Sequence, residues 1–262
     1  MSTVVSKDGT VIDYERYGTG PAVIFIGGAT QYRAIDGRTT SAAQQLAALG
    51  CAAIDYDRRG RGGSGDTAPW APEREAEDVA ALISEVGPAV LYTSSSGATV
   101  ALAAAAARQD IRGMVLYEPP FHAGVDHAEK IAHLRELIAA GRHDEALRYN
   151  MTDVIGVPAQ VADAMAQTPS WPQIVAVAPT VVYDIGAVRE INVDPDWSAR
   201  WSGVTVPTLV LSGDRTFPGL PEAADAVAAA LPNARRQVLP GQDHGPAPDA
   251  IVPVIAEFVR TL

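Results

Sequence analysis

The stretch AVLYTSSSGATVALAAAAA, residues 89–107, joins a short apolar run to an alanine-rich run through three serines and a glycine. The first run has the length and content of a buried strand, and the second has those of a helix packed closely on a sheet. A strand, a tight turn and a helix in this order can expose a nucleophilic side chain at the turn. The stretch therefore predicts an α/β fold and a candidate catalytic serine.

The register of the turn distinguishes between the three serines. A nucleophile at such a turn needs small residues two positions before and two positions after it, because the backbone there is crowded and strained. Ser95 has Thr93 and Gly97 at these positions. The serine before it would have the large Tyr92 as a flank, and the serine after it has no glycine on the helix side. Ser95 is the candidate nucleophile, and the alternative is that these serines only cap the helix.

The same alternation of buried runs and helical patterns extends along the chain in both directions. Around Asp8-Gly9 the pattern predicts an antiparallel hairpin. Beyond it we predict strands at 22–26, 52–56, 89–93, 113–118, 207–213 and 236–241, and helices near 36–49, 72–86, 97–108, 219–231 and 247–261. This order predicts a mostly parallel sheet with helices on both faces.

Residues 121–203 interrupt this rhythm with helical patterns broken by several prolines. Because a structureless loop of that length is improbable in a compact domain, we expect a helical insertion that caps the carboxyl edge of the sheet. The predicted division is a core of residues 1–120 and 204–262 and a cap of residues 121–203.

Composition excludes several kinds of function. The chain has 262 residues and a formal net charge of −11, which opposes binding to nucleic acid or anionic lipid. No apolar run is long enough to span a membrane, and no signal peptide is visible at the start, so we expect a cytoplasmic protein. Cys51 is the one cysteine, no His or Cys cluster has metal-ligand spacing, and the glycine-rich segment 55–66 lacks the ending of a phosphate-binding loop. We expect a small-molecule substrate and neither a metal nor another cofactor; the sequence does not indicate an oligomeric state.

The segment FIGGATQYR, residues 25–33, follows a predicted buried strand with two glycines. Such a loop can leave backbone N–H groups free to hold a negatively charged oxygen, which is the task of an oxyanion hole. We expect Ala29 N–H and Ser96 N–H, the latter at the start of the helix, to be the two donors. The alternative is an ordinary glycine turn.

Together these motifs resemble the α/β-hydrolase superfamily over essentially the whole chain. The resemblance rests on Gly27 and Gly28, on DRRGRGGS at 57–64, on the turn at Ser95 and on GQDHGP at 241–246. It implies an eight-stranded sheet, a serine nucleophile and a histidine base after the last strand, which corresponds to His244. The other four histidines fall in the predicted cap, where solvated or packed roles are expected.

The chain departs from the usual family pattern at three places. Gly27 stands where the family's oxyanion loop commonly has a histidine, which leaves the N–H donors of the loop in place. Thr93 replaces the glycine that usually precedes the nucleophile, and Thr216 stands where the triad aspartate is expected. Two other acids could serve: Glu118, at the end of the strand next to the nucleophile strand, and Asp214, two residues before Thr216. Glu118 could instead anchor the cap and Asp214 could instead form a turn, in which case the site has no acid.

The resemblance implies a serine-dependent hydrolase of a small carboxylic ester, lactone or related acyl compound, acting through an acyl-enzyme. The departures leave an alternative open: a lyase, dehydratase or cyclase on the same fold, with His244 as the base. A third hypothesis is a ligand-binding protein without catalysis. A dehalogenase is disfavoured because it needs an aspartate where Ser95 stands.

Overall fold

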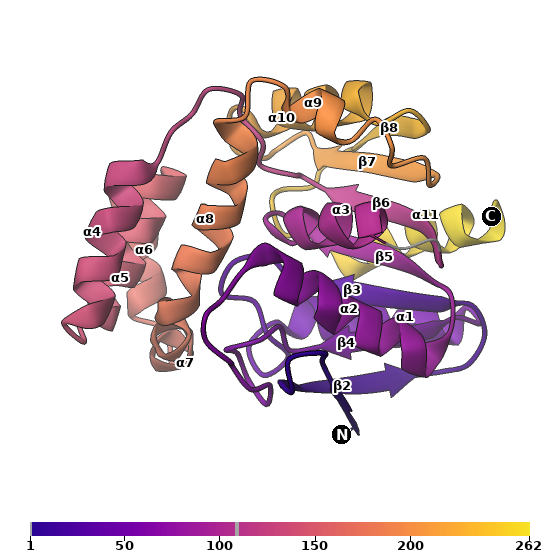
Figure 1. The fold of residues 1–262 in the computed structure, drawn as a ribbon, viewed down its shortest axis with the longest axis horizontal. Coiled ribbons are helices and arrows are strands. Elements are labelled where there is room, and N and C mark those ends of the chain that lie inside the picture. Colours follow the sequence, from indigo (N-terminus) through magenta and orange to yellow (C-terminus); the bar gives the residue numbers. More distant parts are fainter. Residues whose placement is uncertain (1, 108–109) are drawn as a thin grey trace.

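An eight-stranded sheet forms the centre of the protein in the computed structural model, which describes residues 2–107 and 110–262 (Figure 1). Its spatial order is β1-β2-β4-β3-β5-β6-β7-β8. The strands are β1 (Ser2–Val5), β2 (Val11–Tyr17), β3 (Ala22–Ile26), β4 (Ala52–Tyr56), β5 (Ala89–Ser94), β6 (Ile111–Tyr117), β7 (Thr208–Gly213) and β8 (Ala234–Leu239). β2 is antiparallel to both of its neighbours, β1 and β4. The six strands from β3 to β8 are parallel to one another. The predicted mostly parallel sheet and the opening hairpin are confirmed.

Helices cover both faces of the sheet, as predicted (Figure 1). Apolar residues of α2 (Pro72–Val86), α3 (Gly97–Ala107) and α10 (Leu220–Ala230) share one buried cluster with one face of the strands. Residues of α1 (Gly37–Ala48) and α11 (Pro248–Arg260) share a second cluster with the other face. Strands covered on both faces are buried at every position, which is why β3 and β4 are composed almost entirely of apolar residues. The predicted end of α3 at residue 108 lies outside the described residues.

The chain between β6 and β7 is helical. It forms α4 (Ala128–Ala139), α5 (His143–Tyr149), a π-helical turn (Asn150–Ile155), α6 (Ala159–Ala166), α7 (Trp171–Ala176), a 3-10 turn (Ala178–Thr180), α8 (Val181–Asn192) and α9 (Trp197–Arg200). Met151 and Trp171 are buried in a cluster within these helices, so they form part of a local core. Val188 of α8 and Trp197 of α9 instead belong to the cluster of the main sheet. These helices are called the inserted helices below; the division of the chain into core and cap stays a prediction.

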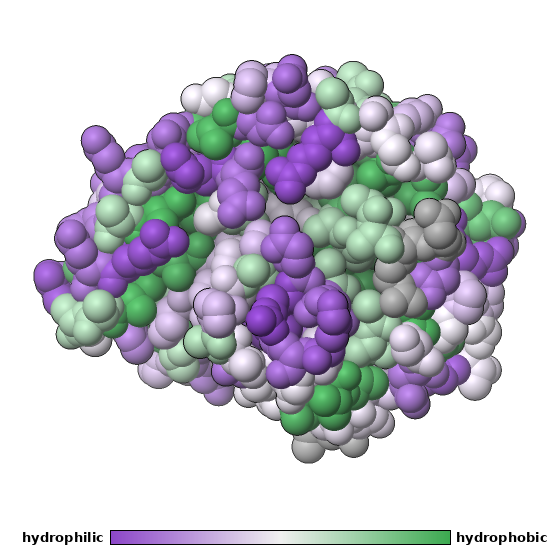
Figure 2. All heavy atoms as spheres, in the orientation of Figure 1, coloured by the Kyte–Doolittle hydropathy of each residue, from purple (hydrophilic) through white to green (hydrophobic). Residues whose placement is uncertain are grey.

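Hydrophilic residues cover much of the surface on the face drawn in Figure 2. Figure 2 shows that most outer atoms on this face belong to hydrophilic residues, and that hydrophobic atoms lie in separate patches between them. In the described part of the chain, no helix combines the length and the apolar content needed to cross a membrane.

The parallel arrangement places the loops after β3, β5, β6, β7 and β8 at one edge of the sheet. Parallel strands end at the same edge, where ligands of α/β proteins usually bind. Each candidate residue predicted from the sequence lies in or beside one of these loops: Ala29 after β3, Ser95 and Ser96 after β5, and Glu118 after β6. Asp214 follows β7, and His244 follows β8.

Asp55, the fourth residue of β4, is a buried carboxylate that does not belong to the set of candidate residues. It is 4% exposed, and its Oδ2 accepts a hydrogen bond of 2.8 Å from Thr40 Oγ1. Burial raises its pKa from 3.8 to about 7, while the Thr40 hydrogen bond and Arg33 oppose the rise. The folded state therefore retains a proton that the unfolded chain has already lost, and each pH unit between these pKa values removes about 1.4 kcal/mol of stability.

Asp55→Asn is therefore expected to stabilise the protein increasingly as the pH rises from about 4 to 7, with no further gain above about pH 8. Asparagine keeps the shape and can still accept from Thr40, but it cannot ionise. Urea unfolding of both proteins across this pH range measures the effect. Parallel stability curves for the two proteins would contradict the assignment.

Candidate active site

The three serines after Thr93 lie in different environments. Ser94 and Ser96 are buried, with exposed fractions of 7% and 4%, whereas Ser95 is partly exposed at the tip of the turn. Ser95 has a φ of 52°, in the left-handed region that costs a non-glycine residue free energy. Its backbone N–H donates to Tyr117 O over 2.9 Å, which ties the turn to the end of β6. Of the three serines, only Ser95 is therefore accessible from outside the protein.

The flanks of Ser95 show why the turn needs small residues on the helix side. A Cβ added at Gly97 would lie 2.6 Å from Ile26 O and 2.9 Å from Gly27 O, so the end of β3 packs directly on this glycine. Thr93 lies within β5, in register with β3 and β6 on its two sides. A β-branched residue suits a regular strand, which accounts for threonine at this flank.

His244 pairs with Glu118. The Nδ1 atom of His244 lies 2.5 Å from Glu118 Oε2, and the carboxyl group is fully buried while the imidazole is 32% exposed. Glu118 also accepts from Gly213 N over 2.8 Å and from Thr216 Oγ1 over 2.7 Å. A carboxylate that accepts from three groups requires the His244 proton on Nδ1, which leaves Nε2 as an acceptor facing outward from the pair.

The backbone around this pair is held on both sides. Glu118 has a φ of 50°, and its N–H donates to Leu211 O over 2.9 Å. The Tyr117 hydroxyl donates to Asp243 O, next to His244. Because Ser95 N–H is bonded to Tyr117 O, one short segment at the end of β6 contacts both the Ser95 turn and the His244 loop.

Asp214, the other acid left open by the sequence, points elsewhere. It is exposed, and its Oδ1 accepts from Gly241 N over 2.6 Å. Thr216, which stands at the position expected for the aspartate, donates to Glu118 instead. The side chain at the usual acid position therefore supports a carboxylate from the neighbouring strand, and the structure brings Glu118, not Asp214, to His244.

Ser95 and His244 form no hydrogen bond with each other in the described part of the chain. Hydrogen bonds between a nucleophile and its base are often long without substrate and shorten when substrate binds.

The loop after β3 lies against the Ser95 turn. A Cβ added at Gly28 would lie 3.1 Å from Ser95 Cβ and 3.0 Å from Ser94 O. Across residues 2–107 and 110–262, neither Ala29 N–H nor Ser96 N–H has a protein acceptor. Thr30, with a φ of 61°, is the third non-glycine residue of positive φ in this region, beside Ser95 and Glu118. Two free donors and concentrated backbone strain are typical of a functional site.

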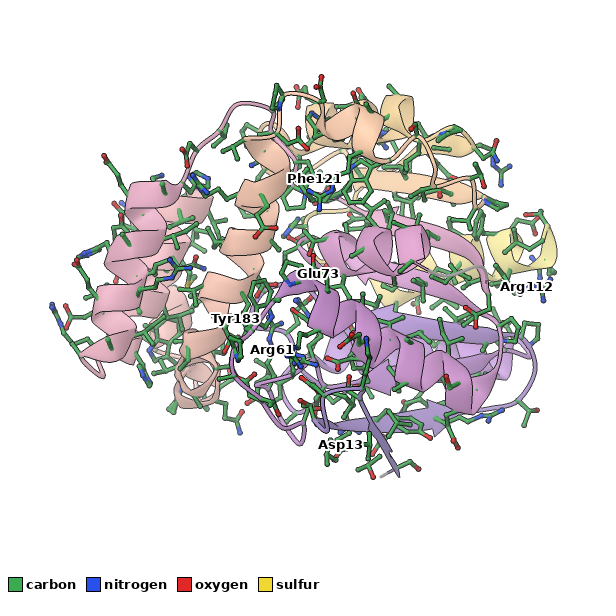
Figure 3. All side chains as sticks on the ribbon, in the orientation of Figure 1. Asp13, Arg61, Glu73, Arg112, Phe121 and Tyr183 are labelled. Carbon is green, nitrogen blue, oxygen red and sulfur yellow. The ribbon has the colours of Figure 1, made fainter. Side chains whose placement is uncertain are left out.

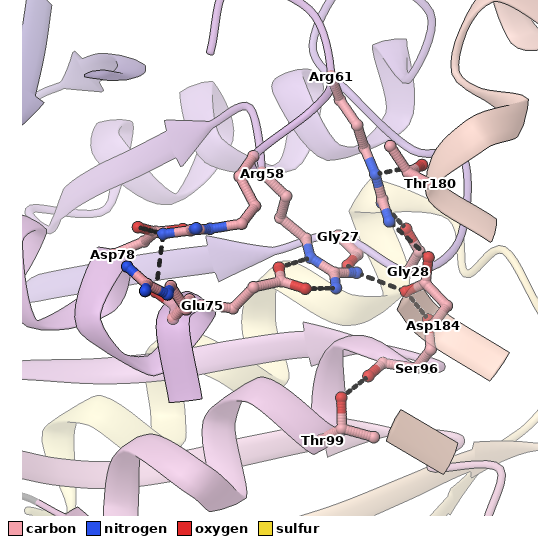
Figure 4. Close-up of polar contacts among 12 residues, drawn as sticks. Gly27, Gly28, Arg58, Arg61, Glu75, Asp78, Ser96, Thr99, Thr180 and Asp184 are labelled. Atoms are coloured by element: carbon pink, nitrogen blue, oxygen red, sulfur yellow. Dashed lines mark hydrogen bonds and ion pairs between the residues drawn. The ribbon is translucent and has the colours of Figure 1, made fainter. Parts of the chain in front are cut away.

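Two arginines bind the backbone carbonyl groups of the loop after β3. Arg58 Nη1 donates to Gly27 O over 3.0 Å, and Arg61 Nη1 donates to Gly28 O over 2.6 Å. Both guanidinium groups are almost completely buried and bind Asp184 of α8, as Figure 4 shows. The sequence predicted only a turn at 57–64 and no role for these arginines. The available signal was two arginines in a glycine-rich turn directly after a buried strand.

The inserted helices border the site. Figure 3 shows Arg61 and Tyr183 where α8 meets the sheet, and Phe121 nearer the other end of this helix. Tyr32 OH, in the loop after β3, donates to Gln173 O of α7 over 3.2 Å. The Phe217 ring is exposed and packs edge-on against His244, with ring centroids 5.7 Å apart. For metals, no group of three or more His, Cys, Asp or Glu side chains among the described residues is placed to share an ion.

Comparisons with known proteins agree with this geometry. The model of the Alpha/beta hydrolase family matches residues 23–256, and no curated protein matches the chain. An alpha/beta hydrolase from Sphaerobacter thermophilus is 42% identical, with a TM-score of 0.88 over 98% of this chain and 100% of that one. A thermophilic esterase from Thermogutta terrifontis is 23% identical, with a TM-score of 0.72 over 99% and 98% of the two chains. An enol-lactonase from Burkholderia xenovorans is 18% identical, with a TM-score of 0.67 over 99% and 100%. The last two show a shared fold, and the family match spans most of the chain: the chain belongs to the alpha/beta hydrolase family of enzymes.

Proposed function

We propose that the chain is a serine-dependent hydrolase of a small carboxylic ester, lactone or related acyl compound. Ser95 is the nucleophile, His244 the base and Glu118 the acid of a catalytic triad. The observation that carries the proposal is the His244–Glu118 pair, 2.5 Å apart, at the strand end to which the strained Ser95 turn is bonded.

The first half of the reaction forms an ester on Ser95. His244 Nε2 takes the Ser95 hydroxyl proton as the oxygen attacks the substrate carbonyl carbon, and the carbonyl oxygen becomes an oxyanion. Ala29 N–H and Ser96 N–H donate to that oxygen. Glu118 accepts the hydrogen bond from Nδ1–H and stabilises the imidazolium that forms. The oxyanion then collapses, His244 gives its proton to the leaving oxygen, and the acyl group stays on Ser95.

The second half repeats these steps with water. His244 removes a proton from water, the hydroxide attacks the acyl carbon, and the carboxylic acid leaves as Ser95 regains its proton. A lactone would keep its leaving group within the same molecule, and an ester would release an alcohol.

The substrate class is supported by the family and by the surroundings of the site. The solved structures named above include an esterase and an enol-lactonase. An exposed Phe217 beside His244 favours an apolar group next to the scissile bond. The acidic net charge disfavours large anionic substrates.

Incubation with a fluorophosphonate, followed by peptide mass spectrometry, tests the nucleophile. We expect the label on Ser95, with Ser94 and Ser96 unlabelled because they are buried. Ser95→Ala is the unlabelled control. A folded wild-type protein that takes no label, or takes it on another residue, would contradict the proposal.

A further inference from the structure

A buried ion cluster joins α8 to the sheet edge that carries the candidate site. It consists of Arg58, Arg61, Glu75 and Asp184, each at most 2% exposed. Arg58 binds both oxygens of Glu75, at 2.6 and 2.7 Å, and Asp184 Oδ1 at 2.7 Å. Arg61 Nη2 binds Asp184 Oδ2 at 2.5 Å. Two positive and two negative groups balance, and Asp184 is the member that comes from the inserted helices.

The cluster also contacts both walls of the proposed oxyanion hole (Figure 4). On one side the arginines donate to Gly27 O and Gly28 O. On the other side Ser96 Oγ donates to Asp184 Oδ1 over 2.8 Å. One carboxylate from α8 is thus bonded to the helix-side donor residue and to both guanidinium groups that hold the loop.

Because the peptide unit is planar, the contact of Arg61 with Gly28 O also orients the N–H group of Ala29. Gly28 C=O and Ala29 N–H belong to one peptide unit, which is planar, and in a trans unit they point in opposite directions. A guanidinium group 2.6 Å from Gly28 O therefore fixes the direction of Ala29 N–H away from Arg61. Gly28 O also accepts from Gln31 N over 3.3 Å. Without the shorter Arg61 bond, this longer bond would hold the unit less firmly, and rotation could turn the carbonyl toward the site and the N–H away from it.

We propose that Asp184 is a positioning residue that aims both donors of the oxyanion hole, acting on Ala29 through Arg61 and on Ser96 directly. This inference rests on the proposed function. Asp184 touches no reacting atom; it fixes the two arginines and the Ser96 side chain in one arrangement.

Electrostatics favour a charged Asp184. Burial raises the pKa of this carboxyl group, but Arg58 and Arg61 outweigh burial and lower it overall. A charged carboxylate accepts from Arg58, Arg61 and Ser96 at the same time, which a neutral side chain of this shape cannot do. It also means that α8 cannot move away from the core without separating buried charges.

Asp184→Asn tests the proposal, with Asp78→Asn as the matched control. Asp78 is 1% exposed and binds Arg59 through both oxygens, at 2.6 and 2.8 Å, and within the described residues it makes no hydrogen bond to the loop after β3 or to Ser96. Both variants keep side-chain shape and remove one buried negative charge. The assays are hydrolysis of a p-nitrophenyl ester, inhibition by a trifluoromethyl ketone whose adduct carries an oxyanion, and thermal unfolding.

In Asp184→Asn we expect kcat to fall by about 10- to 100-fold, ketone affinity to fall by a similar factor, and KM to change by less than about threefold. In Asp78→Asn we expect a smaller loss of Tm, because burial raises the pKa of Asp78 and the folded state favours its charge less, with kcat and ketone affinity close to wild type. Equal kinetic effects in the two variants, or an unchanged kcat in Asp184→Asn, would overturn the proposal.

Two further results keep the test decisive. If Asp184→Asn does not fold, Ser96→Ala removes the Oγ bond while it keeps the backbone N–H; unchanged kcat and ketone affinity in that variant would overturn the proposal.

Wild-type labelling at Ser95 separates this inference from the proposed function. If wild type is labelled and active but Asp184→Asn matches its control, only this inference fails, and if wild type is neither labelled nor active, both fail.

Discussion

Glu118→Gln is expected to lower kcat for ester hydrolysis by about 10⁴-fold, with little change in KM. Glu118 accepts from His244, Gly213 and Thr216. Glutamine has one accepting end and one donating end, so it cannot satisfy all three donors and disfavours the His244 proton on Nδ1. The imidazole would then lose both its tautomer and its orientation. Steady-state kinetics with a p-nitrophenyl ester measure the loss of kcat. Near-UV circular dichroism checks that the variant is folded.

Asp214→Asn is the control for this prediction. Its carboxylate caps Gly241 N at an exposed position, so kcat should stay within about threefold of wild type. A large loss in Asp214→Asn together with a mild one in Glu118→Gln would reassign the acid to Asp214.

Ser95→Ala and His244→Ala are each expected to lower kcat by about 10⁶-fold, and the double variant by no more than either alone. Both side chains act in the same step, because the serine is a weak nucleophile until the base takes its proton. The same ester assay, read against the uncatalysed rate, measures all three variants.

This comparison also tests the alternative of a lyase, dehydratase or cyclase. In such an enzyme His244 removes a proton from the substrate and Ser95 only donates a hydrogen bond. Substantial turnover in Ser95→Ala with none in His244→Ala would therefore favour the non-hydrolytic reaction. Binding that survives in both variants without any turnover in wild type would favour a ligand-binding protein.

The fold could be predicted from the sequence because its signals are local. AVIFI at 22–26 and AAIDY at 52–56 are buried throughout, and apolar runs of this length between helical patterns are typical of the parallel strands of an α/β chain. The turn at Ser95 was also a local pattern. There is no room for a Cβ two residues after the serine at the tip, and of the three serines only Ser95 has a glycine at that position.

The choice of the acid could not be predicted, because it depends on how two loops leave the sheet. Glu118 and Asp214 both lie just after strand ends, and only the three-dimensional path brings the Glu118 carboxylate to His244. The threonine that replaces the expected aspartate gave a warning in the sequence, but its bond to Glu118 is visible only in the structure.

The ion cluster behind the oxyanion loop was missed for a different reason. Arginine side chains are almost never fully buried without a partner, and the partner that Arg58 and Arg61 share lies more than 120 residues away in the inserted helices. A sequence pattern relates residues that are close along the chain, whereas this contact depends on where α8 comes to lie.

The positive φ angles of Thr30, Ser95 and Glu118 have a consequence for the evolution of this protein. Glycine would relieve the backbone at each position by about 1 kcal/mol. At Ser95, whose side chain is partly exposed, the same change would delete the nucleophile of the proposed chemistry. Mutation at this position therefore has a direct route to a more stable but inert protein, and in any lineage that keeps the serine, selection for activity must oppose selection for stability at this codon. At Glu118 the gain is outweighed, because glycine would leave the buried donors of Gly213 and Thr216 without their acceptor.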